Sequence, residues 1–347
     1  MYDPSWPLTV HVLLFVASAV LVAVVGVRLT GAAARIARMT GLGQAMTGAL
    51  FLGASTSLSG IITSVTAAAS GHPELAASNA VGGIAAQTVF LAIADRVYRK
   101  ANLEHAAASD ENMLQGALLI SLLALCLLAV FAPVYSVGGV HPVSILVLVA
   151  YVAGQRLVAT AKGEGMWQPR VTEHTQIEQR REKQGATDGR TRIGVWVRFA
   201  VAALAIGVFG YLLARSGVVI AERTGMSETV LGGLFTAVAT SFPELVTAVA
   251  AVRMGALTLA VSDIMGGNAF DVIFLAVADF AYRDGSLYHA MGSRPTFLIM
   301  LTVLLTSILL MGLIRREKHG IANIGFESFL LLLVYAGGFL LIVTMFG

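Results

Sequence analysis

Charge is scarce in this sequence. Only 12% of its 347 residues are Asp, Glu, Lys or Arg, which is about half the share found in soluble globular proteins. Hydrophobic residues make up 57% of the chain, and the mean hydropathy is +0.80. Because the apolar residues lie in long runs, the composition excludes a water-soluble enzyme. It predicts an all-α integral membrane protein surrounded by the lipid bilayer.

Other absences narrow the chemistry further. The single cysteine, Cys126, excludes a disulfide within the chain and a cysteine cluster for metal. The sequence contains no phosphate-binding loop, no Gly-x-Gly-x-x-Gly, no His-Glu-x-x-His and no nucleophile elbow. We therefore expect no enzymatic activity and no cofactor apart from a transported cation. The basic polar stretch after residue 161 has no aromatic interleaving, so we expect no nucleic-acid partner.

The apolar runs predict the number of membrane helices. A helix that spans a bilayer needs about 20 mainly apolar residues. Ten segments meet or approach this length: 8–30, 41–68, 74–95, 113–133, 141–161, 194–214, 226–251, 256–280, 296–314 and 324–346. The sequence therefore predicts ten transmembrane helices. Whether the chain forms a homo-oligomer stays open.

The basic residues predict an orientation. Lys and Arg collect on the cytoplasmic side of short loops. With the N-terminus outside, 19 of the 23 basic residues fall on the inner side. We therefore expect both termini outside and a cytoplasmic linker at 162–193, which joins a first unit, 1–161, to a second unit, 194–347. The expected location is the inner membrane of a bacterium or archaeon.

The chain contains an internal repeat. A shift of 184 residues aligns 41–95 with 225–279 without a gap, and 21 of the 55 positions are identical. Gly82-Gly83 aligns with Gly266-Gly267, and Thr56-Ser57 aligns with Thr240-Ser241. In the predicted topology the two copies enter the membrane from opposite sides. Inverted repeats of this kind are typical of secondary transporters, whose sites lie near the bilayer midplane in broken helices.

The second copy contains two acidic residues well inside predicted spans, Glu244 and Asp271. A carboxylate at that depth is costly and is by default a functional candidate. Pro243 removes one backbone donor and so frees the carbonyl of Ala239. Thr240, Ser241 and Asn268 lie three or four residues before a carboxylate, on the same helix face. Such an all-oxygen set suits a hard cation such as Ca²⁺ or Na⁺.

These motifs resemble those of the cation/calcium exchanger superfamily, which includes the sodium/calcium exchangers. Ala-Thr-Ser-Phe-Pro-Glu at 239–244 looks like the family's second repeat signature, and Gly-Gly-Asn-Ala-Phe-Asp at 266–271 looks like its partner on the next helix. The resemblance implies a ten-helix fold of two inverted five-helix repeats. It also implies that Glu244 and Asp271 hold the ion, helped by Thr240, Ser241 and the backbone near Ala237 and Ala239.

The first copy departs from this pattern. It keeps Thr56 and Ser57, but Ser59-Gly60 stands where the family has Pro-Glu, and Gln87 stands opposite Asp271. We expect Gly60 to supply the helix bend that Pro243 supplies in the second copy. One half of the predicted site therefore has two carboxylates and the other half has none.

The charge count leaves three functions open. Glu244 and Asp271 supply −2, which one Ca²⁺ or two monovalent cations neutralise. The leading hypothesis is a secondary active antiporter that exchanges Ca²⁺ for Na⁺ or H⁺ and is close to electroneutral. The alternatives are an antiporter of Na⁺ or K⁺ against H⁺, and a membrane sensor of the same fold that does not transport. Asp263 could line an inner ion path or sit at the membrane interface.

Overall fold

The computed structural model of the protein describes residues 3–40, 56–98, 102–161, 189–253, 255, 257–317 and 325–345. In this part of the chain the elements are helices, with one isolated β-bridge between Val137 and Val140. In chain order they are α1 (Leu8–Thr40), α4 (Leu58–Ala69), α5 (Pro73–Val97), α6 (Leu103–Ala107), α7 (Asp110–Phe131), α8 (Pro142–Ala161), α9 (Gly189–Thr224), α10 (Glu228–Val230), the π-helical turn η2 (Leu231–Thr236), α11 (Ala237–Thr240), α12 (Phe242–Arg253), α13 (Leu257–Asp271), α14 (Ile273–Ala281), α15 (Leu287–Ala290), α16 (Ser293–Arg315) and α17 (Phe326–Met345).

Eight of these helices are long and apolar enough to cross a bilayer. A bent pair, Glu228–Thr240 with Phe242–Arg253, is a ninth candidate span. Nine of the ten predicted segments coincide with these candidates. The tenth, 41–68, begins outside the described residues, and its described part consists mainly of the 12-residue helix α4. The protein is therefore an all-helical integral membrane protein with eight or nine candidate spans in its described part.

The predicted linker, 162–193, lies mostly outside the described part of the chain, which excludes residues 162–188. Its last five residues, 189–193, form the first turns of α9. These mainly polar residues therefore continue as a helix into the apolar stretch that follows them.

Helix bounds recur along the chain at the same interval as the sequence repeat. Adding 184 to the bounds of α4, α5 and α8 gives the bounds of α12, of the α13–α14 pair and of α17. The bounds of α6 and α7 agree with those of α15 and α16 to within one residue. The sequence shows the 184-residue interval over 55 positions. In the structure the same interval relates all the helices from α4 to α8 to those from α12 to α17.

The hydrogen bonds recur as well. Asp95 and Asp279, which are 184 residues apart, each accept two backbone N–H groups from equivalent positions. The donors to Asp95 are Leu103 (2.7 Å) and Gly325 (3.0 Å), and those to Asp279 are Leu287 (2.8 Å) and His141 (2.8 Å). Both aspartates therefore tie the end of a long helix to the next short helix and to the start of a span in the other half, α17 for Asp95 and α8 for Asp279.

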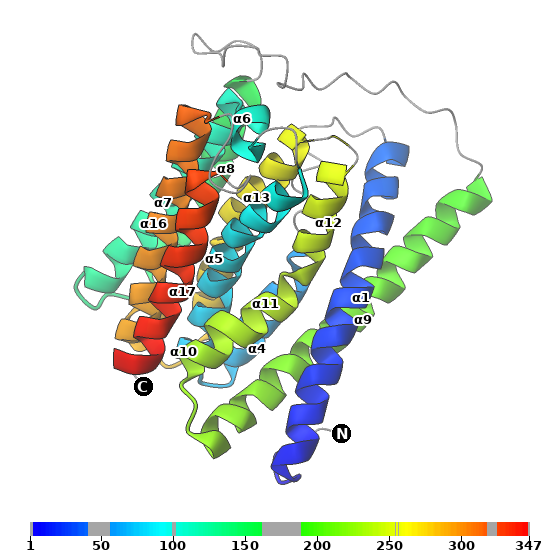
Figure 1. Ribbon diagram of the computed structural model, residues 1–347. Helices are drawn as coiled ribbons and strands as arrows, with labels where there is room; N and C mark the ends of the chain where they lie inside the picture. The colour runs from blue at the N-terminus through cyan, green and yellow to red at the C-terminus, as the bar shows by residue number, and fades with distance from the viewer. Residues whose placement is uncertain are drawn as a thin grey trace.

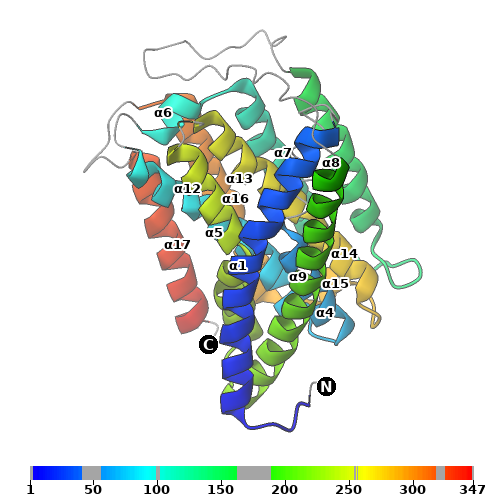
Figure 2. The ribbon, with the colours of Figure 1, turned by 90° about the vertical axis from the view of Figure 1, so that its right-hand side faces the viewer.

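The equivalent elements lie at opposite ends of the molecule. We call the end at which α8 finishes and α9 begins the linker end, and the end with the two termini the terminal end (Figure 1). The short helix α6 lies at the linker end, whereas its equivalent α15 lies toward the terminal end (Figure 2). Helix α5 runs through the middle of the bundle, and 94% of the residues in its apolar 18-residue stretch are buried.

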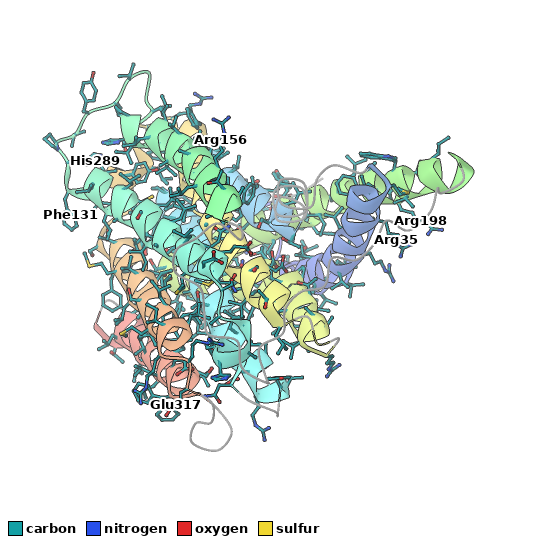
Figure 3. The ribbon with its side chains drawn as sticks, turned by 90° about the horizontal axis from the view of Figure 1, so that it is seen from above. Arg35, Phe131, Arg156, Arg198, His289 and Glu317 are labelled. Carbon is teal, nitrogen blue, oxygen red and sulfur yellow. The ribbon has the colours of Figure 1, made fainter. Side chains whose placement is uncertain are left out.

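Helices α1 and α9 lie side by side and project from the bundle, as the view from the linker end shows, with Arg35 and Arg198 on this pair (Figure 3). Their outer faces expose large apolar side chains such as Leu13, Val20 and Leu204, as expected of surfaces that contact lipid. Helix α1 also packs tightly on α12, since a Cβ atom on Gly26 would lie only 2.4 Å from Cγ of Pro243.

Candidate cation site

Two serines mark breaks in the helices that form the site. Ser57 (φ −79°, ψ −2°) precedes α4 and Ser241 (φ −94°, ψ 3°) precedes α12, at equivalent positions of the two halves. At Ser241 the helix axis bends by 45°. Both ψ angles are close to 0° and so depart from the value of a regular α-helix.

The residues predicted to break these helices, Pro243 and Gly60, lie just after the two serines. Pro243 is the second residue of α12 and Gly60 is the third residue of α4, so both lie in the first turn after a break. Proline is tolerated in the first helical turn because the N–H group it lacks has no partner inside the helix there. Pro243 therefore fits a helix start, and in the other half the break forms at Ser57 without any proline.

Asp271, the last residue of α13, lies at the centre of a hydrogen-bonded group. Its side chain is 2% exposed. Its Oδ1 accepts a hydrogen bond from Oγ of Ser57 (2.5 Å), and its Oδ2 accepts one from Nε2 of Gln87 (2.7 Å). The Gln87 amide also donates to Oγ of Ser241 (3.2 Å). The contacts Ser57–Asp271 and Ser241–Gln87 are equivalent under the 184-residue shift, so the two halves meet at the Gln87–Asp271 hydrogen bond.

Glu244, in the first turn of α12, is the second buried carboxylate, with 4% exposure. The hydroxyl of Thr56 hydrogen-bonds to it. Its Oε2 has no hydrogen-bond partner among the described residues, and neither have Oδ1 of Asn268 and Oε1 of Gln87. A buried oxygen acceptor without a partner is costly in a protein interior. These three oxygens therefore remain available as acceptors or as ligands of a cation.

The neutral oxygen groups proposed as ligands differ in how many hydrogen bonds they already accept from the protein. The Thr240 hydroxyl donates to the carbonyl oxygens of Thr236 (2.9 Å) and Ala237 (3.2 Å), which leaves its own lone pairs available. The Ala237 carbonyl accepts a second hydrogen bond from the Ser241 N–H (3.0 Å), so it has little remaining capacity for a cation. The carbonyl of Ala239 has no helical donor four residues later, because Pro243 lacks an N–H group. Of the two backbone ligands predicted, Ala239 is the better supported.

The amide of Asn268 is held in a fixed orientation. Its Nδ2 donates to Oγ1 of Thr88 (3.0 Å), whose hydroxyl donates to the Ile84 carbonyl (2.8 Å). This anchoring to α5 is consistent with an amide oxygen that is available as a ligand. The sequence did not single out Thr88, because its equivalent in the second half is Val272 and the repeat gives no signal there.

A residue that the sequence left ambiguous, Asp263, is connected to the site. Its Oδ2 accepts a hydrogen bond from Oγ1 of Thr247 (3.3 Å), and the same hydroxyl lies 2.9 Å from the Glu244 carbonyl oxygen. Asp263 and Thr247 are both partly exposed. This side of the site therefore continues into a polar pair of side chains that is less buried than Glu244.

The equivalent region of the first half is closed. Asn79, the counterpart of Asp263, is 2% exposed. Its Nδ2 donates to the Gly60 carbonyl (3.2 Å) and to Oγ of Ser64 (2.9 Å). Thr63, the counterpart of Thr247, is fully buried and donates to the carbonyl of Ser59 (2.8 Å). The polar region beside the site is thus more open in the second half than in the first.

The position of the missing carboxylate is filled by an aromatic ring. A Cβ atom on Gly60 would lie 2.6 Å from Cε2 of Phe274. Within the described residues, no group of three or more His, Cys, Asp or Glu side chains is placed to hold a metal. The site therefore has two carboxylates, and its other oxygens are neutral.

Comparison with known proteins identifies the family. The sequence profile described as "Sodium/calcium exchanger protein" matches residues 10–154 and 194–345. These two segments include most of both halves of the chain. The chain belongs to the sodium/calcium exchanger family. It is accordingly a transporter-family protein and not an enzyme.

Two curated relatives of this exchanger-family chain match it over limited regions. The "Sodium/potassium/calcium exchanger 1" of Bos taurus is 31% identical over 143 residues, which are 40% of this chain and 12% of that protein. The "Putative antiporter CaxA" of Alkalimonas amylolytica is 28% identical over 143 residues, which are 41% of this chain and 43% of that protein. The matched regions thus amount to less than half of either relative.

Two solved structures are similar over nearly the whole chain. A structure described as the "H+/Ca2+ Exchanger CAX" has a TM-score of 0.72 and 15% identity, and covers 95% of this chain and 82% of that one. The sodium-calcium exchanger NCX_Mj has a TM-score of 0.59 and 16% identity, and covers 97% of this chain and 99% of that one. At these identities the similarity establishes the fold alone.

Proposed function

We propose that the protein is a secondary active antiporter that exchanges Ca²⁺ for Na⁺ or H⁺. The cation binds between Glu244 and Asp271, near the membrane midplane. The observation that carries this proposal is the pair of buried carboxylates beside broken helices, together with buried acceptor oxygens for which the described residues supply no donor. The remaining proposed ligands are the side chains of Thr56, Ser57, Gln87, Thr240, Ser241 and Asn268 and the backbone near Ala239, with Ala237 the weakest member.

The proposed exchange is close to electroneutral. Two carboxylates give the site a charge of −2. One Ca²⁺ neutralises this charge when the site carries Ca²⁺ across the membrane, and two monovalent cations neutralise it during the return step. The position equivalent to Glu244 in the first half is Gly60, and Phe274 fills the space beside it. A third monovalent ion would therefore enter the site without a negative charge to compensate it.

We further propose that the chain has ten transmembrane helices arranged as two inverted five-helix units, 1–161 and 194–347. The recurring helix bounds and the placement of α6 and α15 at opposite ends support this arrangement. The linker end then faces the cytoplasm, as the distribution of basic residues favours. In this orientation the partly exposed residues Thr247 and Asp263 open toward the cytoplasm, while Thr63 and Asn79 close the outer side.

A monovalent antiporter is the second candidate, and one observation favours it. The Gln87 amide donates to Oδ2 of Asp271, so part of the negative charge of that carboxylate is already compensated. A site weakened in this way can prefer Na⁺ or K⁺, exchanged for H⁺, over a divalent ion.

Flux through reconstituted vesicles tests the proposal. The purified protein is placed in liposomes, and uptake of Ca²⁺, Na⁺ and K⁺ is followed against imposed Na⁺ or H⁺ gradients while the membrane current is recorded. We expect Ca²⁺ uptake driven by either gradient, with no current that scales with uptake. A current proportional to Ca²⁺ uptake would contradict electroneutral exchange. Uptake of Na⁺ or K⁺ alone would establish the second candidate, and no flux of any cation would exclude both and favour a sensor.

A further inference from the structure

Two glutamates are buried together at the linker end, far from the cation site along the chain. Glu104 of α6 is 1% exposed and Glu327, near the start of α17, is 3% exposed. Their carboxyl groups lie within hydrogen-bonding reach of each other. Oε2 of Glu104 and Oε1 of Glu327 have no partner among the described residues. The ion pairs found in that part of the chain include neither glutamate.

The other half of the molecule shows that the fold does not require acidic residues at these positions. The equivalents of Glu104 and Glu327 are Tyr288 and Val143. The surrounding framework is otherwise retained, because Asp95 and Asp279 bind equivalent backbone N–H groups. The fold therefore needs one aspartate at each end, and the two glutamates are additional.

A count of hydrogen atoms shows what the additional glutamates lack. At the terminal end, Oγ of Ser144 lies 2.6 Å from Asp279 and 3.2 Å from the Tyr288 hydroxyl. That chain has two hydroxyl hydrogens for one carboxylate. At the linker end the equivalent serine, Ser328, lies between Asp95 and Glu104, at 3.3 Å from Oε1 of Glu104. This chain has one hydroxyl hydrogen for two carboxylates.

The charged groups nearby in the described part of the chain contact other partners. Both oxygens of Asp95 accept backbone N–H groups. The ring of His105 bonds to the Arg316 carbonyl (2.7 Å), and the Arg316 guanidinium bonds to the His105 carbonyl (2.9 Å). Glu317 pairs with the exposed Arg315 at the end of α16 (3.8 Å). Burial, followed by repulsion from the two other carboxylates, raises the pKa of Glu104 well above its usual range.

We propose that Glu104 and Glu327 form a proton-binding site that is distinct from the cation site and holds one shared proton. The protonated Glu104 takes the role that the Tyr288 hydroxyl has in the other half, and Glu327 accepts the hydrogen bond. The shared proton forms a hydrogen bond that connects α6 to α17 at the linker end. When the proton is lost, this hydrogen bond is lost and the packing of the two helices is weakened. The proposal does not depend on which ions the protein exchanges.

Thermal unfolding of the full-length protein in detergent, measured from pH 4.5 to pH 9, tests this site. Glu104→Gln mimics the protonated carboxyl group, since its amide donates a hydrogen at the same place. A carboxyl group whose pKa is raised on folding destabilises the folded state as pH rises from its unfolded value of about 4.3 toward its folded value. We therefore expect Glu104→Gln to unfold several degrees above the wild type at pH 8 and at the same temperature near pH 4.5.

Two further variants complete the test. Glu327→Gln should reproduce the effect, and Asp284→Asn, which alters an exposed carboxylate at the other end, should follow the wild type at every pH. The proposal also predicts an infrared band of a protonated carboxyl group at neutral pH that Glu104→Gln removes. A wild type and a Glu104→Gln variant that differ equally at all pH values would overturn the proposal. So would millimolar Ca²⁺ that raises the unfolding temperature at pH 8 clearly more in the wild type than in both Gln variants, which keep the proposed cation site, because the pair would then bind a cation itself.

Discussion

A methyl group added at Gly82 would separate the two helices that cross beside the cation site. An ideal Cβ atom at this position of α5 would lie 2.3 Å from the carbonyl oxygen and 2.4 Å from Cα of Gly233, in η2. Ordinary van der Waals contacts of a Cβ atom lie at 3.4–4 Å. Both obstructing atoms belong to the backbone, so no side-chain rotation relieves the clash. In Gly82→Ala, α5 and η2 have to move apart by about 1 Å.

The second half provides a matched control. Gly266 is the equivalent of Gly82, and a Cβ atom there would come no closer than 3.7 Å, to Nε2 of Gln115. Alanine favours a helix over glycine by about 1 kcal/mol, and this gain is common to Gly82→Ala and Gly266→Ala. Only Gly82→Ala has the cost of overpacking, about 1–3 kcal/mol or more.

We expect Gly266→Ala to be as stable as the wild type or slightly more stable. Gly82→Ala should unfold about 2 °C or more below Gly266→Ala, at about 2–4 °C for each kcal/mol of difference. Thermal unfolding of the purified variants in detergent measures both. Equal unfolding temperatures for the two variants would refute the close backbone crossing of α5 and η2.

Three further predictions concern the site and the terminal end. Gly60→Glu should lower the free energy of unfolding by about 1–3 kcal/mol, because Phe274 occupies the space beside the new side chain. Adding Phe274→Ala should recover part of the loss in unfolding temperature. No recovery would contradict the steric explanation. Gln87→Glu would place a second carboxylate 2.7 Å from Asp271, and two carboxylates at that distance share a proton. The Ca²⁺ affinity of this variant should therefore fall more steeply than that of the wild type as pH is lowered. Identical pH profiles in calorimetric titrations would argue against this contact. A hydrogen bond to Glu228 raises the pKa of His72, so the stability that His72 contributes is complete below its unfolded pKa of about 6.5 and is lost as pH rises through the higher folded value. The wild type should exceed His72→Gln in unfolding temperature only in that acidic range. A difference that is constant with pH would speak against the interaction.

The long-range organisation of the protein could be predicted from sequence because it depends on patterns that are visible along the chain. Nine predicted spans coincide with apolar helices or with the bent pair, since about 20 apolar residues in a row have few alternatives to a membrane helix. The repeat was detectable because identical residues recur at one interval. The burial of Glu244 and Asp271 followed from their depth within the predicted spans.

The local geometry could not be predicted in the same way. Pro243 and Gly60 pointed to the neighbourhood of the helix breaks but not to Ser241 and Ser57, because a proline signals that a helix is interrupted without specifying the residue at which the backbone turns. The contact between Gly60 and Phe274 joins residues more than 200 positions apart, and no periodicity predicts it.

The pairing of Glu104 with Glu327 was also invisible in the sequence. Glu104 lies in a helix of five residues between two spans, where an acidic residue is most simply interpreted as solvated. Only the three-dimensional comparison of the two halves shows that Tyr288 occupies the same position at the other end.

Binding of Ca²⁺ to the purified protein, measured by calorimetry, tests the central claim most directly. The wild type and the control variant Asp284→Asn should bind one Ca²⁺ with the same affinity. Glu244→Gln and Asp271→Asn each keep the shape of the side chain and remove one negative charge from the site, so each should bind Ca²⁺ at least about tenfold more weakly, a loss of about 1.4 kcal/mol or more. If both site variants bind Ca²⁺ as tightly as the wild type, Glu244 and Asp271 do not hold the ion and the proposed site is wrong.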